Sequence, residues 1–139
     1  MKVVGLDVGS RTIGVAVTDE LGMLAHPRTT LAREGTKKDV AAVRALVAAE
    51  GAERVVVGLP LTPEGELGPR AKRVMVLVDA LKEGWAVPVE TWDERFSTVG
   101  AARGLDDAGI FGARRREVID ARAAAFLLQG WLDARASRG

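Results

Sequence analysis

Acidic residues at three widely separated places in this sequence could act together. Asp7 lies inside a run of apolar residues, and Asp120 lies on the apolar face of the last predicted helix. The pair Asp93 and Glu94 directly follows a predicted strand. Carboxylates that gather at one place repel one another unless a divalent cation neutralises them. Since all three places could reach one end of a sheet, we expect a metal site there.

Each of these acidic residues also has a simpler structural explanation. A buried carboxylate needs a partner, and Asp7 could pair with Arg11. Asp120 could be favoured by the positive end of its helix dipole, although this does not explain its place on an apolar face. Asp93 and Glu94 could be solvated turn residues, and one of them could cap the next helix.

The composition limits the kind of metal and of reaction. The chain has no cysteine and one histidine, His26, so a metal would have oxygen ligands, which favours Mg²⁺ or Mn²⁺. Two such ions roughly 4 Å apart can activate a water and stabilise the leaving oxygen in phosphodiester hydrolysis. Acid–base hydrolysis of sugars is less favoured, because three Phe, three Trp and no Tyr leave little aromatic surface for a sugar.

The apolar pattern predicts the elements that position these carboxylates. Alternating or continuous apolar runs indicate five strands, over residues 2–8, 12–18, 23–31, 54–58 and 86–92. Helical spacing indicates helices over residues 36–50, 70–83 and 117–136, and a further helix that begins at Ser97 or Thr98 and ends near Gly109. Three antiparallel strands followed by right-handed crossovers predict one α/β domain, residues 1–139, with a five-stranded mixed sheet flanked by helices.

The charge distribution suggests a surface for nucleic acid. The net charge is +1, but residues 1–94 carry 12 basic and 14 acidic side chains, whereas residues 95–139 carry 8 basic and 5 acidic ones. All eight of those basic residues are arginine, which binds phosphate with two parallel hydrogen bonds. Three of them, Arg114, Arg115 and Arg116, fall in a predicted basic loop over residues 110–116, which could equally be a solvated loop.

No membrane partner is expected. The sequence has no uninterrupted apolar run of the length that spans a bilayer. Its start, Met-Lys followed by a strand-like run, lacks the apolar region and cleavage site of a signal peptide. We therefore expect a cytoplasmic protein.

Four motifs, in this order and spacing, resemble the YqgF/RuvX family of ribonuclease H-like nucleases. Along the chain they are Gly5–Gly9 with Ile13–Asp19, Val57–Leu61 followed by Gly65, Asp93–Thr98, and Asp120–Asp133. The resemblance covers nearly the whole chain and implies a ribonuclease H-like fold.

The resemblance also implies the site residues. It makes Asp7, Glu94 and Asp120 the catalytic and metal-binding carboxylates of a two-metal site, with Asp93 as the alternative to Glu94. Where the family usually has Lys-Arg before Ile-Gly-Val-Ala, this chain has Arg11-Thr12, so Arg11 alone is left for that basic role. Candidates for phosphate contacts are Arg11, Arg95, Arg114, Arg115 and Arg116.

The family is associated with two substrates. The resemblance implies a metal-dependent endonuclease that matures the 5′ end of precursor 16S ribosomal RNA, or alternatively a resolvase that cuts four-way DNA junctions. A resolvase needs two active sites and hence a homodimer, whereas an RNA-trimming enzyme can be a monomer, so both states are left open.

Two rival functions use the same elements. A sugar-kinase or actin-like ATPase opens with a similar strand–Asp-x-Gly–strand element, but it needs two such lobes and 139 residues supply one. A non-catalytic RNA-binding or ribosome-binding module is the second rival, and the complete set of carboxylates argues against it.

Overall fold

The sheet and its helices appear in the order that the sequence predicts. The computed structural model describes the backbone of residues 1–96 and 113–138. Its strands are β1 (Val3–Val8), β2 (Thr12–Thr18), β3 (Ala25–Ala32), β4 (Arg54–Leu59) and β5 (Val89–Asp93). Its helices are α1 (Thr36–Glu50), α2 (Pro69–Lys82) and α4 (Ala113–Arg138), with a short 3₁₀ turn, η1 (Glu94–Phe96).

The five strands form one mixed sheet in the order β3-β2-β1-β4-β5. β1 pairs antiparallel with β2, and β2 pairs antiparallel with β3. The connection between β1 and β2 is short and closes with a hydrogen bond from the Gly9 N–H to the Thr12 carbonyl, 2.8 Å. β4 pairs parallel with β1, and β5 pairs parallel with β4. Each of these strands follows a helix, which carries the chain back to the end of the sheet where β1 begins. The predicted fold class is confirmed.

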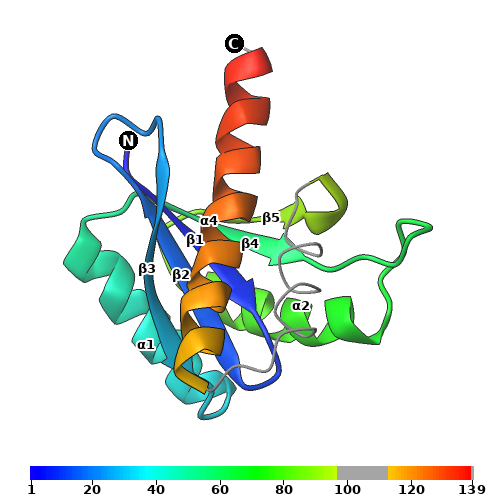
Figure 1. Cartoon of the computed structure of the whole chain (residues 1–139). Coiled ribbons are helices and arrows are strands. Elements are labelled where there is room, and N and C mark those ends of the chain that lie inside the picture. The colour runs from blue at the N-terminus through cyan, green and yellow to red at the C-terminus, as the bar shows by residue number, and fades with distance from the viewer. Residues whose placement is uncertain (97–112, 139) are drawn as a thin grey trace.

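The helices lie on opposite faces of the sheet (Figure 1). α1 and α2 pack on one face against Val4, Leu6 and other apolar strand residues, whereas α4 covers the other face and packs near Val3. Successive side chains of a strand point to opposite faces. Asp7, two pleats along from Val3, therefore faces α4.

The last helix is longer than the sequence predicts. It begins at Ala113 rather than 117, so Arg114, Arg115 and Arg116 belong to its first turns and the prediction of a loop there is wrong. Alanine and arginine are among the strongest helix formers, and this local preference explains the earlier start. The predicted helix over residues 97–109, and loop residues 110–112, lie outside the described residues.

The inner face of α4 is the one that the spacing predicts. Ala123, Ala124, Leu127, Leu128 and Trp131 are all buried against the sheet. None of the helices in the described part of the chain is long and apolar enough to cross a membrane.

Candidate active site

Asp7 lies in the middle of the sheet between two glycines. Its backbone pairs with Gly14 of β2, and the parallel register that pairs Leu6 with Val57 brings Gly58 of β4 level with it. Asp7 is only 1% exposed. Because neither glycine has a side chain, Asp7 carries the only Cβ among these three residues on the face that α4 covers. We call Gly14, Asp7 and Gly58 the Asp7 row.

The glycine on one side of Asp7 makes room for the α4 backbone. A Cβ placed on Gly14 would lie 2.1 Å from the carbonyl oxygen of Asp120, which is impossibly close. α4 therefore rests on β2 at this point. The Thr12 hydroxyl, also on β2, donates a hydrogen bond of 2.5 Å to Oδ2 of Asp120. The Asp120 carboxylate is thus anchored at the edge of the Asp7 row.

The glycine on the other side makes room for Glu94. A Cβ on Gly58 would lie 2.6 Å from Oε1 of Glu94 and 2.8 Å from Cδ2 of Leu127. The Glu94 side chain therefore fills the space over Gly58, beside Asp7. The structure thus places all three predicted carboxylates around one row of the sheet, although they come from β1, η1 and α4.

Asp93 has a different environment from Glu94. It accepts hydrogen bonds from Nε and Nη2 of Arg95 at 2.9 and 2.7 Å, and from the Arg95 backbone N–H at 2.9 Å. These hydrogen bonds from Arg95 hold the pKa of Asp93 below its ordinary value. Trp92 packs on the face of the sheet that α4 covers. Because successive side chains of a strand point to opposite faces, the side chain of Asp93 points away from α4. The geometry favours Glu94 over Asp93 as the partner of Asp7.

The predicted phosphate-binding arginines differ in their surroundings. Arg95 pairs with Asp93, which raises the pKa of Arg95, and also donates from Nη1 to the Pro63 carbonyl at 3.1 Å. It therefore ties the loop between β4 and α2 to η1. Arg11 is exposed on the connection between β1 and β2. The side chains of Arg114, Arg115 and Arg116 lie outside the described residues.

The residues around the Asp7 row suit a hard cation in part. Their donors are carboxylate oxygens, which hard cations prefer, although the space over the two glycines is taken by the Asp120 backbone and by the side chains of Glu94 and Leu127. Within the described side chains, however, no three acidic or histidine residues are close enough to hold one ion together. The hydrogen bond from Thr12 holds the Asp120 carboxylate at the edge of the row. The backbone segments that carry Asp7, Glu94 and Asp120 therefore lie around one row, but the three carboxylates are not close enough to share one ion.

Thr12, Gly14 and Gly58 are site residues that sequence analysis did not identify. A glycine inside a strand often marks a close approach by another segment. Both Gly14 and Gly58 show that signal, since each interrupts a run of apolar strand residues. What approaches each glycine depends on the packing of α4 and η1, which spacing does not reveal.

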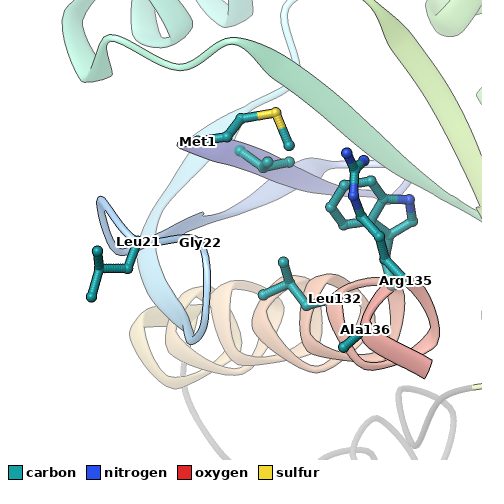
Figure 2. Close-up of a pocket in the computed structure, with 8 residues that line it drawn as sticks. Met1, Leu21, Gly22, Leu132, Arg135 and Ala136 are labelled. Carbon is teal, nitrogen blue, oxygen red and sulfur yellow. The ribbon is translucent and has the colours of Figure 1, made fainter. Parts of the chain in front are cut away.

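A pocket of about 340 Å³ opens at the other end of the sheet (Figure 2). Leu132, Arg135 and Ala136 of α4 line one side, and Met1 and the turn with Leu21 and Gly22 line the other. Val3, which also lines it, precedes Asp7 by four residues, or about 13 Å along a strand. The pocket is therefore separate from the Asp7 row.

Comparisons with known proteins agree with this arrangement. The model of a family described as "RuvX: Holliday junction resolvase" matches residues 1–134. A protein of Myxococcus xanthus named "Putative pre-16S rRNA nuclease" is 50% identical over 134 residues, which cover 96% of this chain and 89% of that protein. One of the same name from Symbiobacterium thermophilum is 46% identical over 138 residues, covering 99% and 96%.

Solved structures share the fold at low sequence identity. RuvC of Thermus thermophilus, in complex with a Holliday junction substrate, has a TM-score of 0.55 at 20% identity, with 98% of this chain and 96% of that chain covered. The fowlpox virus resolvase, in a complex with Holliday junction DNA, has a TM-score of 0.55 at 8% identity, covering 97% and 99%. At these identities the likeness shows the fold alone.

Proposed function

Because the chain belongs to the RuvX family of Holliday junction resolvases, we propose that it is a metal-dependent endonuclease that matures the 5′ end of precursor 16S ribosomal RNA. It is a hydrolase of phosphodiester bonds. The observation that carries the proposal is the Asp7 row, where one glycine makes room for the Asp120 backbone and the other for the Glu94 side chain. The whole chain, residues 1–139, forms one nuclease domain in this proposal, and it acts in the cytoplasm.

The relatives favour RNA as the substrate. Two proteins named as putative pre-16S rRNA nucleases match this chain at 50% and 46% identity over almost its full length. The alternative substrate is a four-way DNA junction, which the description of the family model favours. A phosphodiester is common to both, so the same site serves either substrate.

The proposed roles follow from the placement of each residue. Asp7, Glu94 and Asp120 would be the ligands of Mg²⁺ or Mn²⁺, bound as a pair of ions. Bound metal supplies an activated water and stabilises the charge that develops on the phosphodiester. Asp7 is fixed by its strand, whereas Glu94 can turn about its own side-chain bonds. Thr12 holds the Asp120 carboxylate at the edge of the row.

The arginines have two kinds of role in this proposal. Arg11, exposed on the connection beside Asp7, contacts phosphate of the nucleic acid. Arg114, Arg115 and Arg116, whose backbone belongs to the first turns of α4, are further candidates for phosphate contacts. Arg95 contributes to phosphate binding only at the cost of its bonds with Asp93, so its main role is to hold the loop before α2.

Cleavage of the two substrates side by side tests the proposal. The wild-type protein is incubated with a precursor 16S RNA fragment and with a four-way DNA junction, each with and without Mn²⁺. We expect cleavage of the RNA only with metal. Preferential cleavage of the junction would favour the alternative, and absence of cleavage of both would contradict a nuclease.

Substitution of Asp7 has the largest expected effect on activity. Asp7→Asn keeps the shape of the side chain but removes its charge, so cleavage should fall at least about a hundredfold while the circular dichroism spectrum stays unchanged. The matched control is Asp133→Asn, because Asp133 is an exposed carboxylate on α4. Equal activity of Asp7→Asn and wild type would remove Asp7 from the site.

Paired amide substitutions separate Glu94 from Asp93. Glu94→Gln should lower cleavage about tenfold or more, because it removes a charge beside Asp7. Asp93→Asn should lower cleavage much less, since Asp93 faces Arg95. The reverse order would assign the ligand position to Asp93.

A further inference from the structure

An ion pair between a buried aspartate, Asp39, and a half-buried arginine, Arg33, lies next to the connection between β1 and β2. Asp39, in the first turn of α1, is 3% exposed. Its Oδ2 accepts a hydrogen bond of 2.8 Å from Nε of Arg33, and its Oδ1 accepts one of 2.9 Å from the Glu34 backbone N–H. Both oxygens of the carboxylate are therefore engaged, and the segment that follows β3 is fixed to α1.

Arg33 reaches from this pair to the connection itself. Its Nη1 donates to the carbonyl of Gly9 at 2.8 Å, and its backbone N–H donates to the carbonyl of Arg11, also at 2.8 Å. Gly9 and Arg11 are the first and last residues of the three that join the two strands. One arginine thus holds both ends of the connection.

The connection carries two residues of the Asp7 site. Asp7 precedes Gly9 by two residues, and Thr12, which binds the Asp120 carboxylate, directly follows Arg11. We propose that Arg33 and Asp39 are positioning residues that hold this connection, so that Asp7 and Asp120 stay placed for a shared cation. This inference rests on the proposed nuclease function.

The chemistry of the pair favours positioning over simple stability. A partly buried ion pair such as this one is weak evidence of stabilisation, because its attraction roughly repays the cost of removing its charges from water. Arginine offers several donors in a fixed planar fork, and here Nε serves Asp39 while Nη1 serves Gly9. Lysine has one nitrogen and cannot reproduce that geometry. Arg33→Lys therefore keeps the charge but loses the double contact.

The chain provides a matched control at the other end of the same two elements. Glu50, the last residue of α1, pairs with Arg28 of β3 at 2.5 Å and with Lys2 at 3.1 Å. The Glu50 side chain is 13% exposed. This pair also joins β3 to α1, but Lys2 lies before the start of β1, away from Asp7. Glu50→Gln therefore removes a comparable ion pair without touching the connection.

The test compares Arg33→Lys, Asp39→Asn and Glu50→Gln with wild type. For each, we measure the Tm, the Kd for Mn²⁺ by calorimetry, kcat and KM for the cleaved substrate, and amide hydrogen exchange at Gly9. We expect Arg33→Lys and Asp39→Asn to weaken Mn²⁺ binding and lower kcat about tenfold or more, with KM little changed. The Gly9 amide, which bonds to Thr12, should exchange faster. Glu50→Gln should lower the Tm but leave these readouts as in wild type.

A purely structural pair would give a different result. In that case Arg33→Lys would lower the Tm while Mn²⁺ binding, kcat and Gly9 exchange matched those of Glu50→Gln, and the proposal would be overturned. If Asp39→Asn fails to fold, Arg33→Lys decides the question alone. If wild type cleaves neither substrate, the nuclease function fails separately, and the Mn²⁺ and Gly9 readouts still decide whether the pair positions the connection.

Discussion

The two ends of α4 lie on the same sheet face but contact it in different ways. Near Asp120 the helix approaches the strands so closely that only glycine fits below it, at Gly14. Near its C-terminal end, the large side chains of Trp131 and Leu132 pack against the sheet, and a pocket of about 340 Å³ opens beside them. One end is fixed by the backbone, and the other by the bulk of apolar side chains.

This difference explains why Asp120 is held beside the Asp7 row, at one end of the contact between α4 and the sheet. A backbone contact leaves no freedom for the position of Asp120, whereas a layer of large side chains can repack when one of them changes. The turn beside the pocket also exposes Leu21, Met23 and Leu24. Substitutions at the Asp7 end should therefore affect activity, and those at the pocket end should not.

Gly14→Ala should give the largest effect among the variants that test this comparison. A Cβ there would meet backbone atoms of Asp120, which cannot turn away as a side chain could. We expect a loss of about 3 kcal/mol in the free energy of unfolding, measured by urea titration, together with loss of cleavage. The control is Gly5→Ala, whose Cβ would meet Cβ of Leu128 at 2.8 Å on the same helix but away from Asp120. Wild-type activity in Gly14→Ala would contradict the backbone contact.

Gly58→Ala should have a smaller effect on stability. The added Cβ would meet the ends of two side chains, Glu94 and Leu127, which can turn aside. We expect a cost of about 1 kcal/mol in unfolding free energy. Activity should fall about tenfold, because Glu94 is displaced from the Asp7 row. Full activity with the same loss of stability would show that Glu94 need not lie over Gly58.

The same contrast separates what the sequence predicts from what it does not. The inner face of α4 follows from helical spacing alone, and so Asp120 could be placed facing the sheet. To choose between Asp93 and Glu94 as the metal ligand, one must know where Arg95 lies. One must also know to which face of the sheet the side chain of Asp93, the last residue of β5, points. The roles of Gly14 and Gly58 depend on strand register, which brings residues from distant segments level with Asp7 and is not encoded in any one segment.

The ion pair between Asp93 and Arg95 should have a modest effect that depends on pH. Arg95 holds the pKa of Asp93 below 3.8, so the pair stabilises the folded chain above that pH and its contribution is lost as pH falls through the lowered value. Asp93→Asn should therefore be slightly less stable than wild type at pH 7. This difference should narrow as the pH falls below 3.8, as urea midpoints at several pH values would show. If the difference in urea midpoint between Asp93→Asn and wild type instead grew as the pH fell, this expectation would be contradicted.

Leu21→Ser should have the smallest effect, because it changes the pocket end. The Leu21 side chain is 78% exposed, so its removal uncovers almost no buried apolar surface. We expect the unfolding free energy to change by less than about 0.5 kcal/mol, and Mn²⁺-dependent cleavage to equal that of wild type. Since the two ends share one helix, a loss of cleavage in this variant would mean that the pocket end influences the Asp7 row through α4. If cleavage is unchanged in Leu21→Ser but lost in Gly14→Ala, nuclease activity requires the close contact of α4 with the sheet at Asp120 and not the packing at the pocket end.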